Sequence, residues 1–208
     1  MKVYDYKGFP NPARVRIALA EKGLLDQVEF VHVDVPGGEH KQPAFLAKNP
    51  SGAVPLLELE DGTMISECTA ITEYLDNQDG NPVLTGHTAK ERAVIHMMQR
   101  RIEAGLLDAA AAYFHHATAG LGPDIETYQN ADWGRKQGER AVATMRTLDG
   151  ELAGRAYMAG DTFTMADISA MAGLSYADFA KIETPPELTH LAAWRARVNA
   201  RPSVAASA

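Results

Sequence analysis

Strand-like residue patterns occur only in the first 66 residues of this 208-residue chain, and helix-like patterns fill the remainder. This division predicts a compact α/β domain over residues 1–78 and an all-helical domain over residues 88–208. A linker that contains Gly and Pro, at residues 79–87, joins the two domains. A chain of this length buries enough surface for two domains, so its stability requires no disulfide or structural metal.

The α/β domain is predicted from a strand–helix–strand unit that is followed by a hairpin. Two short strands bridged by one helix favour parallel pairing with a right-handed crossover. The hairpin is indicated by Asp61-Gly62 between two short apolar runs, a sequence that is typical of tight β-turns. The expected strands and helices follow one another at residues 2–6, 13–22, 28–35, 43–48, 54–59, 63–66 and 67–78.

The second domain is predicted to be a helical bundle because its apolar residues recur at helical spacing. Thr164 and Asp167 form a capping-box-like start to one of its helices. The first long helix carries a mixed stripe, Ile95, Gln99 and Glu103, which favours a two-fold interface over a core and predicts a homodimer. The expected helices lie at residues 88–117, 131–153, 165–180 and 187–200.

The charge balance and the cysteine content exclude several classes of function. The formal net charge is -7, and an acidic surface repels phosphate backbones, so we expect no nucleic-acid partner. Cys68 is the only cysteine, which excludes an internal disulfide and a CxxC redox pair and agrees with a reducing, cytoplasmic location. The charged N-terminal segment and the absence of a long apolar run predict neither a signal peptide nor a membrane partner.

Four segments of the chain form a recognisable set: RVRIALAEKG (14–23), NPSGAVPLLELEDG (49–62), ECTAITEYLD (67–76) and AGDTFTMADI (159–168). In this order and at this spacing they resemble glutathione transferases. The resemblance implies a thioredoxin-like glutathione-binding domain, an all-α C-terminal helical bundle domain, a dimer, and a metal-free reaction that joins glutathione to a hydrophobic electrophile in detoxification. A further segment, Tyr113 to Pro123, resembles an atypical yeast and bacterial subgroup that lacks the usual catalytic Tyr, Ser or Cys.

The resemblance also implies which residues bind glutathione. Val54-Pro55 resembles the family's Val–cis-Pro, which exposes the Val54 backbone to pair with the cysteinyl peptide like an added strand. Glu67 and Cys68 occupy the family's Glu-Ser position at a helix start, where unpaired N–H groups suit the γ-glutamyl carboxylate and Glu67 meets the amine. The structural alternative for Val54-Pro55 is an ordinary proline at the start of a strand. For Glu67 it is an acidic residue that the helix dipole alone favours.

A second pair of residues, His40 and Lys41, matches the basic positions that meet the glycyl carboxylate of glutathione in related classes. The alternative for this pair is a solvated loop without a role in binding. Elsewhere in the chain, Asp167 resembles a buried capping residue that is important for folding in the family, so we expect its role to be structural.

Thiol activation is where the chain departs from the family pattern. Phe9 stands at the position of the catalytic Ser of related classes, and a phenyl ring cannot stabilise a thiolate. Asn11 matches an Asn that lies near the thiol in a bacterial class, so its amide or backbone N–H is expected to donate to sulfur. Lowering the thiol pKa by two units takes about 2.7 kcal/mol, which one or two such donors and a helix dipole supply.

His115 and His116 lie near the end of the first long helix, which lines the substrate cleft in the family. A neutral His115 imidazole is expected to hold or deprotonate a water beside the thiol. Ala111 replaces the Ser that helps to position this water in the resembling subgroup. The structural alternative for each His is a helix C-terminal cation or a core hydrogen bond. Phe9, Tyr113 and His116 are expected to line the second-substrate pocket.

The sequence leaves two other functions open. Phe9 at the Ser position is compatible with a non-catalytic module that binds glutathione or a partner protein. The second alternative is glutathione-dependent reduction of peroxides or mixed disulfides, as in a peroxidase or thiol reductase. In that reaction Cys68 or bound glutathione is the reacting thiol.

Overall fold

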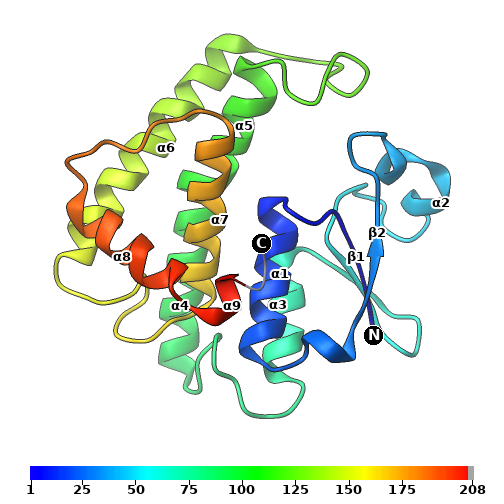
Figure 1. Ribbon diagram of the computed structural model, residues 1–208, viewed down its shortest axis with the longest axis horizontal. Coiled ribbons are helices and arrows are strands. Elements are labelled where there is room, and N and C mark those ends of the chain that lie inside the picture. The colour runs from blue at the N-terminus through cyan, green and yellow to red at the C-terminus, as the bar shows by residue number, and fades with distance from the viewer. Residues whose placement is uncertain (206–208) are drawn as a thin grey trace. The chain divides into compact units, whose positions relative to one another are not determined.

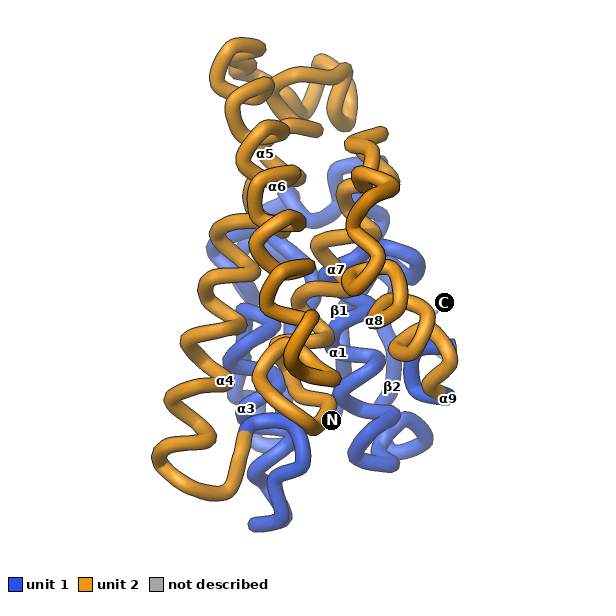
Figure 2. Tube along the Cα trace, turned by 90° about the vertical axis from the view of Figure 1, so that its left-hand side faces the viewer, with its two compact units in different colours: residues 1–85, 202–208 blue, residues 86–201 orange. Residues whose placement is uncertain are grey.

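The computed structural model describes residues 1–205, and Figure 1 shows the course of the chain. The chain divides into two compact units, which Figure 2 shows in different colours. The first unit is Met1–Thr85 together with the segment that begins at Pro202, and the second unit is Gly86–Arg201. These limits differ from the predicted domains, because residues 79–85 and the last described helix belong with the α/β unit.

The first unit follows the predicted order of strands and helices. Its elements are β1 (Lys2–Asp5), α1 (Pro10–Glu21), η1 (Leu25–Gln27), β2 (Glu29–His32), η2 (Glu39–Lys41), α2 (Pro43–Leu46), β3 (Leu56–Glu58), β4 (Met64–Ser66), α3 (Cys68–Asn77) and α9 (Pro202–Ala205). The sheet has the strand order β2-β1-β3-β4. The predicted parallel pairing joins β1 to β2, and the predicted hairpin joins β3 to β4. α9 packs against α1, where Ser203 donates a hydrogen bond to Glu21.

The two faces of the sheet are set by the alternation of side chains along its strands. Val3 and Leu57 lie in a buried cluster with residues of α1 and α3, whereas Leu56 packs with Val33 and Phe45 in a separate cluster. The other buried members of the first cluster are Val15, Leu19, Cys68, Ile71 and Leu75. This core fixes α1 against α3, and it thereby positions the N-termini of both helices.

α1 begins at Pro10, three residues before its predicted start. The N–H groups of a first helical turn have no partner within the helix, so a proline, which lacks an N–H, costs no hydrogen bond there. Its fixed φ also suits the first helical positions. Pro10 and Pro12 therefore belong to the first turn of the helix and do not break the chain before it. β2 in turn ends at His32, earlier than the predicted strand 28–35.

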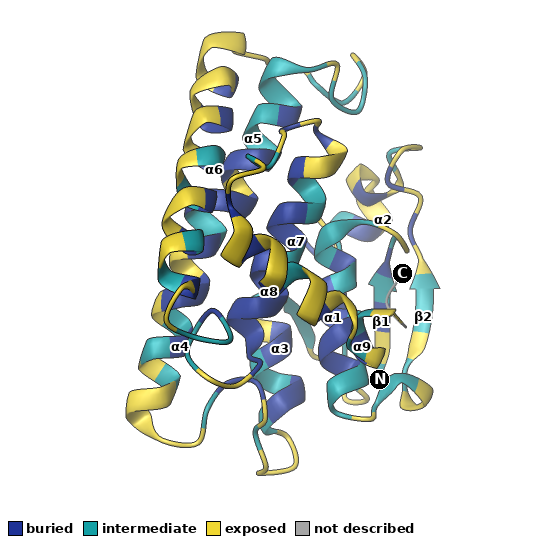
Figure 3. Ribbon diagram, turned by 60° about the vertical axis from the view of Figure 1, so that its left-hand side comes forward, coloured by how far each residue is buried: buried dark blue, intermediate teal, exposed yellow. Residues whose placement is uncertain are grey.

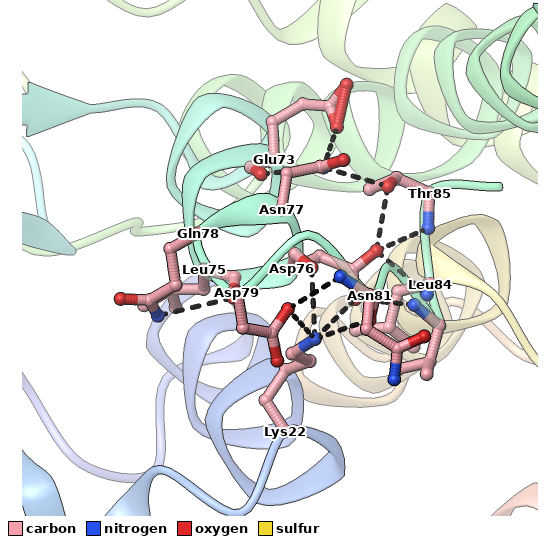
Figure 4. A network of polar contacts seen from close by, with 11 residues as sticks. Lys22, Glu73, Leu75, Asp76, Asn77, Gln78, Asp79, Asn81, Leu84 and Thr85 are labelled. Atoms are coloured by element: carbon pink, nitrogen blue, oxygen red, sulfur yellow. Dashed lines mark hydrogen bonds and ion pairs between the residues drawn. The ribbon is translucent and has the colours of Figure 1, made fainter. Parts of the chain in front are cut away.

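Asp76 anchors most of the segment that the sequence predicts as a linker (Figure 4). Its side chain is fully buried near the end of α3. Lys22 donates from its Nζ to the Asp76 carbonyl oxygen at 3.0 Å and to Asp79 Oδ1 at 2.9 Å. The Asp76 carboxylate itself accepts bonds of 2.7 to 2.9 Å from Val83 N, Leu84 N, Thr85 N and Thr85 Oγ1. These bonds explain why residues 79–85 stay with the first unit.

The second unit is built from helices, as predicted. They are α4 (Ala89–Ile102), η3 (Glu103–Leu107), α5 (Asp108–Ala117), α6 (Ala131–Leu152), α7 (Met165–Phe179) and α8 (Thr189–Asn199). α7 begins at the predicted capping box of Thr164 and Asp167, and it is buried along most of its length (Figure 3). Within residues 1–205, none of the helices has the length and apolar character needed to cross a membrane.

The predicted helix 88–117 is continuous but contains a π-helical turn, η3. Thr144 of α6 donates from its Oγ1 to the Gly105 carbonyl oxygen at 2.9 Å. A Cβ at Gly105 would lie 2.6 Å from that hydroxyl oxygen. Glycine therefore permits the close approach of α6 at the turn, and the hydrophobic periodicity of the sequence gives no sign of it.

The stripe predicted to form a subunit interface is buried within the single chain. Ile95 and Gln99 are 6% and 2% exposed, and α4 packs against α7. Gln99 Nε2 donates to Glu103 Oε1 at 3.3 Å. The interpretation of this stripe as a two-fold surface is therefore wrong, because two of its three side chains are buried within the single chain. The homodimer itself stays a prediction.

Candidate active site

The first turn of α1 offers one residue that can donate hydrogen bonds from both backbone and side chain. Phe9 is the N-cap, and Pro10 and Pro12 have no N–H, so among the first three helical residues only Asn11 has a backbone donor. Asn11 Oδ1 accepts from Arg14 Nη1 at 3.3 Å, which assigns the oxygen to Arg14 and leaves the Nδ2 amide as a further donor. Both donors lie at the positive end of the helix dipole.

Phe9 is held at the start of α1 by an aromatic stack. Its ring centroid lies 4.5 Å from that of Tyr6, which in turn lies 5.3 Å from the His32 ring. The side chain makes no capping hydrogen bond. The position therefore presents an aromatic ring and no hydroxyl at the start of α1.

The Val54–Pro55 peptide bond is cis, as predicted. Val54 lies two residues before Leu56, which pairs with Tyr4 of β1 on one side and with Ser66 of β4 on the other. Leu56 is the first residue of β3 in both ladders, so the Val54 backbone follows the sheet just beyond its last paired residue. A bound peptide can pair with backbone groups in this position.

Glu67 is the N-cap of α3, with φ 68 and ψ 121, and the predicted start of the helix at 67 is one residue too early. A non-glycine residue in this region of φ is strained by about 1–3 kcal/mol, and such strain is concentrated at functional sites. The Glu67 side chain is exposed and makes no capping bond. It is therefore available to a ligand at the N-terminus of α3.

Cys68, the first residue of α3, is 7% exposed, and its Sγ donates to the Asn11 carbonyl oxygen at 3.5 Å. This contact joins the first turn of α1 to the first turn of α3. The two helix N-termini that the sequence assigns to the thiol and to the γ-glutamyl carboxylate are therefore neighbours. A helix dipole is positive at the N-terminus, so each of these two ends favours an anion.

His40 and Lys41 both lie in η2, but they differ in environment. His40 is 6% exposed and its Nδ1 has no hydrogen-bond partner, so the solvated-loop alternative does not hold for it. Burial, and secondly the charge of Lys41, lower the pKa of His40. His40 is therefore neutral at pH 7 and acts as a hydrogen-bonding group, not as a cation. Lys41 is exposed, and its Nζ donates to the Gly52 carbonyl oxygen at 2.7 Å.

His115, in the second unit, has partners on both ring nitrogens. Its Nδ1 lies 2.6 Å from Glu126 Oε1, and its Nε2 lies 3.3 Å from Tyr176 Oη. Glu126 and Tyr176 lie 11 and 61 residues away along the chain and are not among the site residues that the sequence predicts. No local pattern links a loop carboxylate or a phenol of α7 to this imidazole, so only the fold could identify them.

His116 and Tyr113 take other directions from α5. His116 Nδ1 accepts from Asn130 N at 3.2 Å, so its role includes holding the loop after α5. Tyr113 packs on Gly138 of α6 and lines a cavity of about 550 Å³ with Val142 and other residues of the second unit. The structure therefore does not bring Tyr113 to the His115 cluster. Among residues 1–205, no three His, Cys, Asp or Glu side chains are grouped to hold a metal ion.

A sheet with a cis-proline just before an inner strand, two neighbouring helix N-termini and a following helical unit are the arrangement of a glutathione-binding transferase fold. Comparison with family models agrees: the glutathione S-transferase N-terminal domain matches residues 10–78, and the C-terminal domain matches residues 111–202. The chain is 55% identical over 204 residues to glutathione S-transferase 2 of Saccharomyces cerevisiae, covering 98% of this chain and 88% of that protein. The chain therefore belongs to the glutathione S-transferase family of enzymes.

Solved structures extend the comparison. The crystal structure of Gtt2 from Saccharomyces cerevisiae is similar with a TM-score of 0.97 and 55% identity over 99% of each chain. A glutathione S-transferase domain-containing protein of Marinobacter aquaeolei VT8 is 62% identical, with a TM-score of 0.96 over 98% of this chain and 100% of that one. A theta-class enzyme of Xanthomonas axonopodis pv. citri, solved with glutathione bound, is 25% identical, with a TM-score of 0.81 over 99% and 95%.

Proposed function

We propose that the enzyme joins the glutathione thiol to a hydrophobic electrophile and activates the thiol without a catalytic Tyr, Ser or Cys. The observation that carries this proposal is the first turn of α1, where Asn11 supplies a backbone N–H and a side-chain amide. Lowering the thiol pKa by two units takes about 2.7 kcal/mol. Two donors to a thiolate at a helix N-terminus are sufficient for this.

The rest of glutathione would follow the first unit from α1 to α3. The Val54 backbone pairs with the cysteinyl peptide, and the N-terminus of α3 receives the γ-glutamyl carboxylate beside Cys68. Glu67 meets the γ-glutamyl amine, and its exposure and strained backbone support this role. In this proposal Lys41 meets the glycyl carboxylate as a cation, and the neutral His40 meets it as a hydrogen-bond donor. The glutathione-bound relative from Xanthomonas supports glutathione as the co-substrate.

The burial of Cys68 favours transfer over a cysteine-based reductase. Its thiol is 7% exposed and already donates to the Asn11 carbonyl, and a buried structural thiol is a poor nucleophile. The free thiol also fits a reducing, cytoplasmic location. In this proposal the enzyme acts in detoxification as a homodimer, which rests on its membership of the family, and Phe9 and His116 contribute to the second-substrate pocket.

Replacing Glu67 by alanine is expected to weaken glutathione binding by at least about tenfold, because a charge-assisted hydrogen bond in a partly dry site is worth about 1.5–3 kcal/mol. Titration calorimetry with glutathione measures the change. Glu67→Gln retains the size and the backbone conformation and should lose only part of the affinity. Glu60→Ala, at a residue whose side chain is 92% exposed, is the surface control. Equal affinities of the wild type and Glu67→Ala would remove Glu67 from the site.

Replacing Asn11 by alanine is expected to raise the pKa of the bound glutathione thiol by about one unit, the equivalent of one donor worth about 1.4 kcal/mol. The effect is partial because the backbone N–H remains. The ultraviolet absorbance of the thiolate, followed against pH with glutathione bound, measures it.

His115 is the second contributor in this proposal, through a water that it holds. His115→Ala should lower turnover more modestly than Asn11→Ala, and Ala111→Ser should raise turnover by anchoring the water from a second side chain. If neither single variant nor the Asn11→Ala, His115→Ala double variant moves the thiolate titration, both assignments are wrong. The helix dipole then becomes the leading source of thiolate stabilisation.

A further inference from the structure

The loop that follows α5 is folded around one carboxylate. The side chain of Glu126 is 9% exposed, and its Oε1 accepts from Leu121 N at 2.9 Å as well as facing His115 Nδ1 at 2.6 Å. Gly120 makes room for it, since a Cβ there would lie 2.3 Å from Glu126 Oε1. Gly120 also has φ +56, a conformation that favours glycine. The position of Glu126 against His115 is therefore built into the loop.

The ionisation of Glu126 decides which ring nitrogen of His115 carries the proton. Burial by itself raises the pKa of Glu126, but the Leu121 N–H and the His115 ring outweigh it, so the pKa lies below its usual value. An ionised carboxylate can only accept hydrogen bonds. The nitrogen at 2.6 Å must therefore donate, and in the neutral imidazole the other nitrogen, Nε2, keeps its lone pair.

The two bonds of the ring differ in strength. The Nδ1 to Glu126 distance of 2.6 Å is that of a charge-assisted bond. The Nε2 to Tyr176 Oη distance of 3.3 Å exceeds the usual range for a hydroxyl donor. Burial, and secondly the charge of Glu126, raise the pKa of Tyr176 to about 12, so the phenol keeps its proton and donates. The Glu126 bond is therefore the stronger of the two and fixes the orientation of the ring.

We infer that Glu126 is a positioning residue that holds His115 as the Nδ1–H tautomer and so presents Nε2 as the acceptor. Tyr176 occupies this acceptor with its hydroxyl until a water takes its place. The consequence for turnover rests on the role proposed above for His115, but the tautomer does not. An imidazole in the opposite tautomer would offer an N–H at Nε2 and could not accept a proton from water there.

Nuclear magnetic resonance of the full chain, labelled with ¹⁵N at histidine, tests the tautomer directly. At about pH 8 an ordinary imidazole is neutral, and the two nitrogens of His115 are identified by their loss in His115→Gln. We expect the proton on Nδ1 in the wild type, and a shift toward Nε2–H in Glu126→Gln and Glu126→Ala. Tyr176→Phe should keep the proton on Nδ1, and the exposed Glu139→Gln should change nothing.

A wild-type spectrum with the proton on Nε2 overturns the inference, and so does an unchanged tautomer in both Glu126 variants. Because the first of these needs no substitution, misfolding of a variant cannot hide the result. Steady-state kinetics separates the inference about the tautomer from the role proposed for His115 in turnover. Glu126→Gln should lower kcat about fivefold, which corresponds to the loss of one hydrogen bond, with little change in the KM for glutathione. A changed tautomer with unchanged kcat supports the inference and contradicts the role of His115.

Discussion

Replacing Asp76 by alanine is expected to lower the free energy of unfolding by about 3–5 kcal/mol. The fully buried carboxylate accepts three successive backbone N–H groups, at residues 83–85, and alanine leaves all three without an acceptor. Each unsatisfied buried donor costs about 1–3 kcal/mol. Chemical denaturation followed by circular dichroism measures the loss. Hydrogen exchange at the same three amides shows whether this segment opens first.

Asp79 provides the matched control for Asp76. It accepts from the same Lys22 ammonium at 2.9 Å, but its side chain is 53% exposed. An exposed ion pair of this kind contributes little to stability, because water and salt screen the two charges. Asp79→Ala should therefore be nearly as stable as the wild type. If Asp76→Ala loses no more stability than Asp79→Ala, the buried acceptor is not what holds residues 83–85 to the first unit (Figure 4).

The sequence predicts those parts of the fold that neighbouring residues determine. Asp61-Gly62 between two apolar runs is sufficient to predict the β3–β4 hairpin. The capping box of Thr164 and Asp167 is sufficient to predict the start of α7. The π-helical turn at Gly105 depends on a hydroxyl of another helix, so no local pattern indicates it. The sequence does not predict the burial of Gln99 for a similar reason: this burial depends on polar partners that the helical pattern does not show.

The candidate site also has parts that the sequence predicts and parts that only the fold determines. The cis bond before Pro55 and the position of Glu67 at a helix start belong to short segments that carry their own geometry. The partners of His115 come from a loop and from α7. These contacts arise only when distant segments pack, so the sequence indicates a candidate side chain and the fold supplies its orientation.

Replacing Asp167 by alanine is expected to have an effect of similar size within the second unit. The side chain is fully buried; Oδ1 accepts from Met158 N at 2.9 Å and Trp194 Nε1 at 2.8 Å, and Oδ2 accepts from Thr164 N at 2.9 Å. Alanine leaves these donors unpaired and removes half of the capping box, a loss of about 3–5 kcal/mol. For a chain of this size the melting temperature should fall by about 10 °C, which scanning calorimetry measures.

Asp167→Asn tests whether this site needs two acceptor oxygens. Burial raises the pKa of Asp167, while its hydrogen bonds from Met158, Trp194 and Thr164 oppose this. Both oxygens face donors, so an asparagine would turn its NH₂ group toward one of the two sets and should be nearly as destabilising as alanine. Trp194→Phe removes one donor and part of a fully buried ring, so it should cost about 1–3 kcal/mol, and the exposed Asp161→Ala should cost almost nothing. An asparagine variant as stable as the wild type would show that one acceptor oxygen is enough to join α8 to the start of α7.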